Sequence, residues 1–320
     1  MEGLITTSTT FAIEVTDLVK KYGDLVAVNG ISLQIEKGEI FAFLGPNGAG
    51  KTTTVEIIEG VRKATSGDVE ILGCDVNKQR EFDKIKKIIG TLPQRFVTHR
   101  NLTVYENIRY WCRLYEESLP VERLIKMVKL EEKRKTRYKN LSGGLKRKLG
   151  IAISLVNDPE IVFLDEPTTG LDPRARRDTW EIIEGLKEQG KTVFLTTHYM
   201  EEAQVLADTV AIIHKGEIIA IGTPSQLIDQ HGGDNKIIVR CNSTEVRDKI
   251  HNLLLEMNPN ENEDGDIVIS AKKGTTSEVI ELLEKEKVRY TDIITTRPTL
   301  EDVFLELTGE QLVEEESVGK

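Results

Sequence analysis

Two glycine-rich segments of this sequence contain the residue types that hold a phosphate group. The first is Gly45-Pro46-Asn47-Gly48-Ala49-Gly50-Lys51-Thr52, followed by Thr53. It matches the pattern G-x-x-x-x-G-K-[ST], in which backbone N–H groups close around an anion and the lysine reaches its oxygens. The second is Leu141-Ser142-Gly143-Gly144, a glycine-rich helix start where unpaired N–H groups also point at negative charge. Because one phosphate group needs only one cradle, the pair indicates two copies of the chain that face each other, each completing the other's site.

Side chains suited to metal binding and to activating water follow the apolar run of residues 161–164. Asp165 comes at the end of this run, where a carboxylate has no packing use but can hold a metal ion. We therefore expect Asp165 and the hydroxyl of Thr52 to bind Mg²⁺, and Glu166 to act as the general base or to orient the attacking water. Alternatively, the two acidic residues cap a helix N-terminus, although residues 167–170 (Pro-Thr-Thr-Gly) are typical of a loop.

A histidine follows a second apolar run, residues 192–195, after two threonines. If these two runs form parallel strands, their carboxyl ends meet at one edge of the sheet, which is where open parallel sheets bind ligands. From that edge we expect His198 to reach the γ-phosphate of a nucleotide, while Lys51 lies between the β- and γ-phosphates. A lone histidine is more often structural, and that alternative stays open.

The elements that position these residues predict an α/β fold. Residues 39–44 form a near-continuous apolar run, as in a strand buried on both faces, and they lead into the phosphate loop and a helix through about Val61. Residues 12–35 read as two strands joined by a turn at Tyr22-Gly23-Asp24, and residues 210–221 as a hairpin around Lys215-Gly216. A mostly helical stretch covers about 102–157, broken by Pro120 and by the second glycine-rich segment.

A second, smaller α/β domain is predicted after a linker at residues 229–235. Its pattern reads strand, helix, strand, helix, strand and helix, at about 236–241, 244–257, 266–271, 276–287, 289–296 and 299–308. We therefore expect a flexible N-terminus at 1–11, a nucleotide-binding domain at 12–232 whose helical part covers about 95–157, an accessory domain at 233–310 and a frayed tail at 311–320.

Composition and charge narrow the class of protein. From residue 233 onward the chain carries 11 Lys or Arg and 20 Asp or Glu, a net charge of −9 out of −10 for the whole chain. Such an acidic excess disfavours nucleic acid as a partner. The basic run at residues 133–139 reads as solvated surface, with a phosphate or lipid-headgroup contact as the alternative.

The lack of a signal peptide leads us to expect a cytosolic chain. It has no run of about 18 apolar residues that would span a membrane, and residues 1–10 lack the basic start and apolar core of a signal peptide. The three cysteines, Cys74, Cys112 and Cys241, are too few and too far apart for a disulfide framework or a zinc cluster, so we expect buried thiols.

The motifs together resemble the ATP-binding cassette (ABC) family of transporter ATPases, from about residue 12 to residue 230. The resemblance implies a P-loop NTPase fold, a RecA-like core with a helical subdomain, that binds ATP and Mg²⁺. It implies that residues 142–144 bind the γ-phosphate held by the opposite subunit, and that His198 is a switch histidine. It adds roles for Tyr22 (stacking on adenine), Gln94 (reaching Mg²⁺ and the attacking water) and Asp172 (the loop that crosses the dimer interface). Leu145 departs from the family, which often has glutamine there, so we expect weaker coupling at most.

Two features resemble the ABC-2 type exporter branch, which includes drug-resistance and sodium-extrusion ATPases. One is Lys146-Arg147-Lys148-Leu149 after the second glycine-rich segment, and the other is the segment of residues 297–309, beginning Arg297-Pro298-Thr299. In physical terms, Thr299 and Asp302 resemble a capping box on a helix with one apolar face. A capped helix closing a small core explains these residues equally well.

The resemblance implies an ATPase that dimerises on ATP, with a second copy the expected partner. The dimer would drive separate membrane-spanning permease subunits from the cytoplasmic face of the membrane. The alternative is a soluble ABC-type ATPase that acts on ribosomes or DNA. Relatives of that kind carry two cassettes in one chain or a long coiled coil. This chain has one phosphate loop and one copy of the second glycine-rich segment, and Ser142 follows Lys51 by 91 residues with no sustained heptad repeat between them. For the acidic domain, a regulatory or dimer-stabilising role and a purely structural one are both open.

Overall fold

The computed structural model describes residues 11–262, 264–271 and 275–310 of the chain. They form two compact units, and the boundary between these units in the sequence falls between Pro224 and Ser225. The predicted boundary after residue 232 falls inside the second unit. Of the flexible N-terminus predicted at 1–11, Phe11 instead begins the first strand, and residues 1–10, like the predicted tail at 311–320, lie outside the described residues. Each unit has its own hydrophobic core, and we describe them separately.

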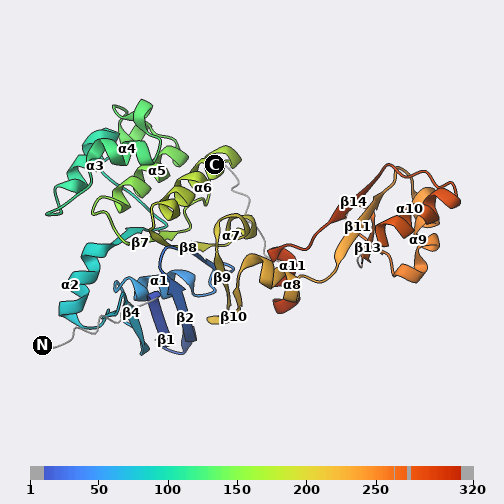
Figure 1. The fold of residues 1–320 in the computed structure, drawn as a ribbon, viewed down its shortest axis with the longest axis horizontal. Helices are drawn as coiled ribbons and strands as arrows, with labels where there is room; N and C mark the ends of the chain where they lie inside the picture. The colour runs from blue at the N-terminus through green and yellow to red at the C-terminus, as the bar shows by residue number, and fades with distance from the viewer. Residues whose placement is uncertain (1–10, 263, 272–274, 311–320) are drawn as a thin grey trace, which may run out of the picture. The chain divides into compact units, whose positions relative to one another are not determined.

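A six-stranded sheet forms the centre of the first unit (Figure 1). Its strands, in spatial order, are β10 (Glu217–Gly222), β9 (Thr209–His214), β3 (Ile40–Leu44), β8 (Thr192–Thr197), β7 (Ile161–Asp165) and β6 (Ile89–Leu92). All neighbours are parallel except β10 and β9, which form the predicted hairpin. Every residue of β3, β7 and β8 is buried, as expected for strands covered on both faces.

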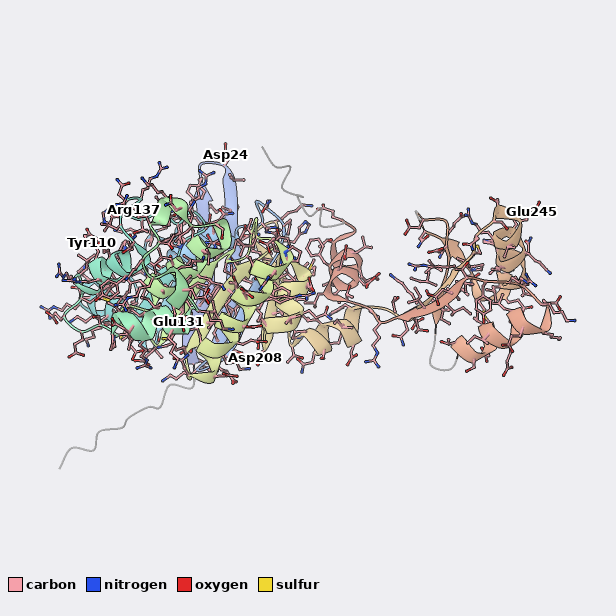
Figure 2. All side chains as sticks on the ribbon, turned by 90° about the horizontal axis from the view of Figure 1, so that it is seen from above. Asp24, Tyr110, Glu131, Arg137, Asp208 and Glu245 are labelled. Carbon is pink, nitrogen blue, oxygen red and sulfur yellow. The ribbon has the colours of Figure 1, made fainter. Side chains whose placement is uncertain are left out.

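A second sheet of the first unit is antiparallel, in the order β2-β1-β4-β5. Its strands are β1 (Phe11–Tyr22), β2 (Leu25–Glu36), β4 (Ser66–Ile71) and β5 (Cys74–Asp75). Tyr22, predicted as part of the turn, is the last residue of β1 and pairs with Leu25 across a two-residue turn, and Asp24 lies at the exposed tip of this hairpin (Figure 2). The two strands predicted at residues 12–35 are therefore confirmed.

Helices cover the central sheet: α1 (Lys51–Ile58), α2 (Gln79–Ile88), α3 (Val104–Cys112), α4 (Val121–Met127), α5 (Gly143–Ser154), α6 (Pro173–Glu188) and α7 (Met200–Leu206). The predicted helical stretch is α3 to α5 with short 3₁₀ turns at Glu131–Lys133 and Tyr138–Asn140. α1 ends three residues before the predicted Val61, which is 73% exposed.

Alternate residues of the sheet strands enter two different cores. Val162 and Leu164 of β7 pack with α3, α4, α5 and α6, whereas Ile161 and Phe163 pack with α1 and the antiparallel sheet. This period of two is what a strand with both faces buried requires. The carboxyl ends of β7 and β8 carry the polar side chains Asp165, Thr196 and Thr197.

The second unit contains a four-stranded antiparallel sheet in the order β12-β13-β11-β14. Its strands and helices are α8 (Pro224–His231), β11 (Asn235–Arg240), α9 (Thr244–Leu253), β12 (Asn260–Glu261), β13 (Ile267–Ala271), α10 (Thr275–Lys285), β14 (Asp292–Thr296) and α11 (Leu300–Thr308), with a 3₁₀ turn at Leu255–Met257. Ile250 of α9 and Leu283 of α10 share one core with Ile237 and Ile267 of the sheet. The two helices therefore cover the same face.

Several sequence-based expectations for the second unit need correction. The predicted linker at residues 229–235 is largely occupied by the end of α8 and the start of β11. The helix predicted at 244–257 ends at Leu253, and the strand predicted at 289–296 begins at Asp292. The capping box of Thr299 and Asp302 is confirmed at the start of α11.

The three cysteines are free and half-buried rather than buried, which corrects the expectation of buried thiols. Across the described residues, no helix is long and apolar enough to cross a membrane.

Candidate nucleotide-binding site

The phosphate loop joins β3 to α1, as its sequence predicts. Residues 45–50 form the turn, and Lys51 to Thr53 open the helix. A Cβ on Gly45 would lie 2.3 Å from the carbonyl oxygen of Ile213, and one on Gly50, whose φ is +106°, would lie 2.4 Å from that of Ala27. Only glycine fits at these two positions. No side chain caps α1, so its first N–H groups remain available to an anion.

Lys51 is almost fully buried and points back into the loop. Its Nζ donates hydrogen bonds to the carbonyl oxygens of Gly45 (2.7 Å) and Pro46 (3.1 Å), and lies 3.6 Å from Oε1 of Glu166. Burial lowers the pKa of Lys51, and the nearby Glu166 opposes that shift. The ammonium is held by weak carbonyl partners, which phosphate oxygens could replace.

Asp165 and Thr52 bring oxygen atoms together beside this lysine. Oγ1 of Thr52 lies 3.5 Å from Oδ2 of Asp165, whose other oxygen accepts a hydrogen bond from Oγ1 of Thr196. Burial raises the pKa of Asp165, and the Glu166 charge adds to the rise. A hydroxyl and a carboxylate are the oxygen donors that Mg²⁺ prefers, so this pair fits that ion.

Glu166 is 4% exposed and receives contacts from four side chains. Gln94 Nε2 and Thr169 Oγ1 donate to its Oε2 at 2.8 and 3.1 Å, and His198 Nδ1 lies 3.4 Å from Oε1, close to Lys51. Burial by itself would raise the pKa of Glu166. The interactions with His198, Lys51 and Gln94 outweigh it and hold that pKa at about 2. The carboxylate is therefore ionised at neutral pH.

His198 follows β8, which is parallel to β7 and pairs Asp165 with Thr196. This confirms the predicted strand arrangement. Its Nδ1 is buried and has no hydrogen-bond partner among the described residues, so it faces Glu166 at an ion-pair distance of 3.4 Å. The sheet edge thus brings together residues from four separate segments of the sequence: Lys51 and Thr52, Gln94, Asp165 and Glu166, and His198.

Other predicted residues lie away from this cluster. Tyr22 ends β1 and is 39% exposed, with Nζ of Lys20 and the guanidinium of Arg62 at 5.1 and 5.5 Å from its ring centre. Asp172 caps α6, because its Oδ1 accepts from the N–H of Ala175 at 2.9 Å. Asp172 therefore has a local structural role at the start of α6.

The second glycine-rich segment begins α5, as predicted. Ser142 is its N-cap and accepts from the N–H of Leu145 at 3.4 Å. A Cβ on Gly144 would lie 2.8 Å from that of Ala175, so this glycine also lets α5 approach α6. Leu145 packs against the neighbouring core. A hollow of about 200 Å³ lies here, lined by residues that include Gln94, Gly143 and Gly170.

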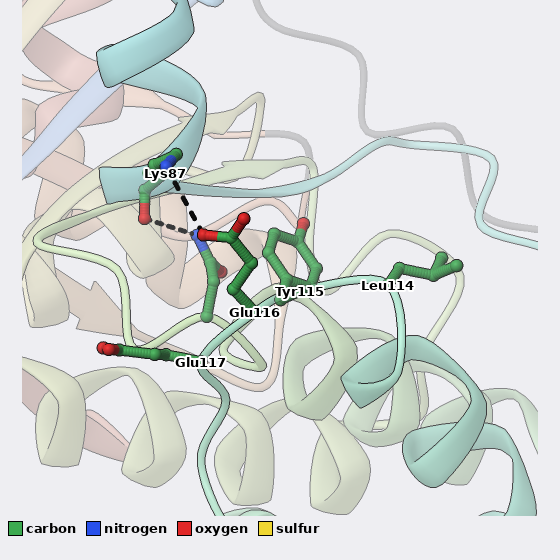
Figure 3. Close-up of a pocket in the computed structure, with 6 residues that line it drawn as sticks. Lys87, Leu114, Tyr115, Glu116 and Glu117 are labelled. Carbon is green, nitrogen blue, oxygen red and sulfur yellow. Dashed lines mark hydrogen bonds and ion pairs between the residues drawn. The ribbon is translucent and has the colours of Figure 1, made fainter.

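A larger hollow of about 510 Å³ lies elsewhere on the first unit (Figure 3). Its lining residues include Lys87, Leu114, Tyr115 and Glu116, none of which the sequence suggests for chemistry. Nζ of Lys87 and Oε2 of Glu116 are 3.8 Å apart.

Sequence reasoning missed three residues that contact the site. Thr169 and Thr196 hydrogen-bond to Glu166 and Asp165, and Arg147 of α5 donates to the carbonyl oxygen of Glu166. The threonines adjoin predicted residues, so their position was a usable signal. Arg147 carries no such signal, because its contacts depend on how α5 packs.

The phosphate loop lies between a strand and a helix, and its buried lysine lies beside two carboxylates at the end of another strand. This arrangement defines a P-loop nucleotide hydrolase. Comparison with known proteins narrows this class. Residues 28–169 match the family described as "ABC transporter". The chain is 35% identical over 318 residues to the linearmycin resistance ATP-binding protein LnrL of Bacillus subtilis (strain 168), covering 94% of this chain and 99% of that protein.

Two further comparisons indicate the same family. The Nod factor export ATP-binding protein I of Rhizobium meliloti (strain 1021) is 36% identical over 311 residues, which cover 95% of this chain and 90% of that protein. A dimeric structure of a post-hydrolysis state of the ATP-binding cassette MJ0796, bound to ADP and Pi, aligns with a TM-score of 0.59 and 28% identity, over 66% of this chain and 98% of that one. The chain belongs to the ABC transporter family, as an ATP-binding subunit that hydrolyses ATP.

Proposed function

We propose that this chain powers export: two copies close on two ATP molecules, and closure moves separate membrane-spanning subunits of the ABC-2 type. The chain would work at the cytoplasmic face of the membrane. Support comes from resemblance over both units to an export protein and a resistance protein. The observation that carries the ATPase part is the buried, ionised Glu166 beside Lys51 and His198. The alternative of a soluble ATPase acting on ribosomes or DNA finds no support in these relatives.

In this proposal the phosphate loop and Lys51 bind the phosphates, and Thr52 and Asp165 hold Mg²⁺ with Gln94 nearby. When bound, the ion would neutralise charge on the phosphate oxygens. Tyr22 offers an exposed ring for the base. Ser142, Gly143 and Gly144 of the opposite subunit would complete the site, because a helix N-terminus suits an anion. Asp172 would act at the dimer interface while capping α6.

Glu166 would orient the attacking water. A carboxylate with a pKa near 2 is a weak proton acceptor at neutral pH, yet it accepts hydrogen bonds well. When Lys51 turns to phosphate oxygens, Glu166 loses one of the charges that hold its pKa down, and its basicity rises. His198, whose Nδ1 lacks a hydrogen-bond partner among the described residues, is placed to respond to the same change.

The Glu166→Gln variant tests this role. We expect it to bind ATP, to hydrolyse it at least about 100-fold more slowly because the water is no longer held by a charge, and to accumulate as a dimer. Single-turnover hydrolysis and size-exclusion chromatography with ATP measure these effects.

Glu59→Gln is a matched control. Burial, together with the Asp165 and Glu56 charges, raises the pKa of Glu59 to about 8, so at pH 7 the amide replaces a carboxyl that is mostly protonated. Its hydrolysis should match the wild type. Turnover near the wild-type rate in Glu166→Gln would show that the assigned role is wrong.

The transporter part needs a separate test. We expect affinity purification of the tagged chain from detergent-solubilised native membranes to recover a stoichiometric protein with several apolar spans. Recovery of ribosomal proteins or DNA without a membrane protein would contradict export and leave only the ATPase chemistry.

A further inference from the structure

Arg147 is a buried arginine whose partners are all backbone carbonyl oxygens. It lies in the second turn of α5 and is 9% exposed. One guanidinium nitrogen, Nη1, donates to the carbonyl oxygens of Pro93 (3.2 Å) and Gln94 (3.4 Å), and Nη2 donates to that of Glu166. The planar fork of one side chain thus joins the loop of Gln94 to the loop of Glu166.

The backbone that Arg147 holds at Glu166 is strained. Glu166 has a φ of +45°, in the left-handed region that side chains other than glycine rarely adopt. Such residues persist where the surroundings fix them on several sides. Here Thr196 accepts from the Glu166 N–H through its carbonyl (3.2 Å) and hydroxyl (3.0 Å) oxygens, while Arg147 and the N–H of Thr169 (3.4 Å) donate to the Glu166 carbonyl. Arg147 is the one of these partners that comes from another subdomain.

The helix that carries Arg147 is closely packed on two sides, so it moves little without moving its neighbours. A Cβ on Gly150 would lie 2.6 Å from Leu92 at the end of β6, and one on Gly144 would lie 2.8 Å from Ala175 in α6. Lys148, next to Arg147, forms an ion pair of 2.8 Å with Asp178 of α6. The two adjacent cations of α5 therefore bind different neighbours. Arg147 binds the loops of Gln94 and Glu166, and Lys148 binds α6.

We propose that Arg147 is a positioning residue, which fixes the turn of Glu166 and the loop of Gln94 relative to α5. The inference rests on the proposed function, in which the first turn of α5 meets the nucleotide of the opposite subunit. A displacement of α5 on meeting that nucleotide would reach Glu166 of its own subunit through a single guanidinium. The ATP bound in one site would in this way set the geometry of the catalytic carboxylate in the other.

Arg147→Gln and Arg147→Lys in the full chain test the proposal. The lysine keeps the charge, but one ammonium cannot hold carbonyls of both loops as a fork does. We expect both variants to lose about 10- to 100-fold in kcat, the cost of a misplacement near 1 Å, while the Kd for ATP changes by less than about threefold. Lys148→Gln is the matched control on the same helix, because it breaks an ion pair with α6 and leaves both catalytic loops bound. It should keep kcat within about threefold of wild type, and its Tm shows what disturbing α5 alone costs.

A double-mutant cycle separates positioning from a merely structural role. If Arg147 acts through Glu166, Arg147→Gln should slow single-turnover hydrolysis strongly in the wild type but little in the Glu166→Gln background. Equal losses in both backgrounds, or wild-type kcat in both Arg147 variants, would overturn the proposal while leaving the role of Glu166 intact. Wild-type hydrolysis by Glu166→Gln itself would instead reject the proposed function of Glu166, and the inference with it.

Discussion

Glu166 keeps its charge in a nearly dry site because cations and donors surround it. Removing a carboxylate from water favours its neutral form, yet Lys51, His198 and Gln94 reverse that preference. For Asp165, the neighbouring carboxylate, burial outweighs the charges of Lys51 and Arg147, and its pKa shifts in the opposite direction. Two adjacent acidic residues therefore differ in basicity because of what surrounds them.

This difference makes the stability of the first unit depend on pH. The pKa of Glu166 is 4.5 in the absence of its partners and about 2 in the folded chain, so its ionisation stabilises the fold above pH 4.5 and this contribution is lost as the pH falls toward 2. We expect the difference in free energy of unfolding between wild type and Glu166→Gln to shrink by about 1 kcal/mol between pH 7 and pH 3.5.

Urea unfolding measures this difference through the fluorescence of Trp111 and Trp180. They are the two tryptophans of the chain and both lie in the first unit. A difference that is constant over this pH range would show that Glu166 titrates in the folded chain as it does in the unfolded one.

At the level of elements, glycines set how closely α5 and its neighbours approach. A Cβ on Gly90 of β6 would lie 1.8 Å from the carbonyl oxygen of Ser154, at the end of α5. The backbone cannot relieve so short a contact unless the strand β6 moves away from α5. We expect Gly90→Ala to lower the free energy of unfolding by about 1–3 kcal/mol or more.

Gly185→Ala provides the comparison. Gly185 is inside α6, has open space around its Cα and an ordinary φ, so alanine should stabilise the helix by about 0.5–1 kcal/mol. Both variants can be followed by urea unfolding. Equal effects of the two substitutions would mean that the contact between β6 and α5 does not constrain the fold.

Some elements were predictable from the sequence because their signals are local. The apolar runs of β3, β7 and β8 and the pattern of the phosphate loop identify Lys51, Asp165 and His198 without any tertiary information. The two-residue strand β5 was missed because pairing with β4 defines it. The last residues of α8 were misread as a linker because Gly232-Gly233 follow the helix directly, although Pro224 at its first position favours a helix start. Arg147 could not be found because its acceptors are backbone atoms of two distant loops.

Over the whole molecule, charge and chemistry are divided between the units. Residues after Pro224 contain 11 Lys or Arg and 21 Asp or Glu, so they carry the entire net charge of −10. Every residue of the candidate site lies before Pro224. The second unit, residues 225–311, contains 10 Lys or Arg and 18 Asp or Glu, a net charge of −8. We expect this charge to add repulsion between two copies, and like charges repel less in salt.

A chain ending at Pro224 tests this division. We expect it to bind ATP within about threefold of the full chain, because the phosphate loop, β7 and β8 have their own cores without the second unit.

The lifetime of the ATP-bound dimer, unlike ATP binding, should depend on the second unit. In the Glu166→Gln background, raising the ionic strength should lengthen the lifetime of the ATP-bound dimer in the full chain and change it little in the shortened one, since only the full chain has a net charge to screen. A chain ending at residue 232, which keeps α8, controls for loss of that helix. If the shortened chain folds, by the fluorescence of Trp111 and Trp180, but no longer binds ATP, the second unit is part of the ATPase core. If both dimers respond to salt alike, its acidic charge does not act on dimerisation and a purely structural role remains.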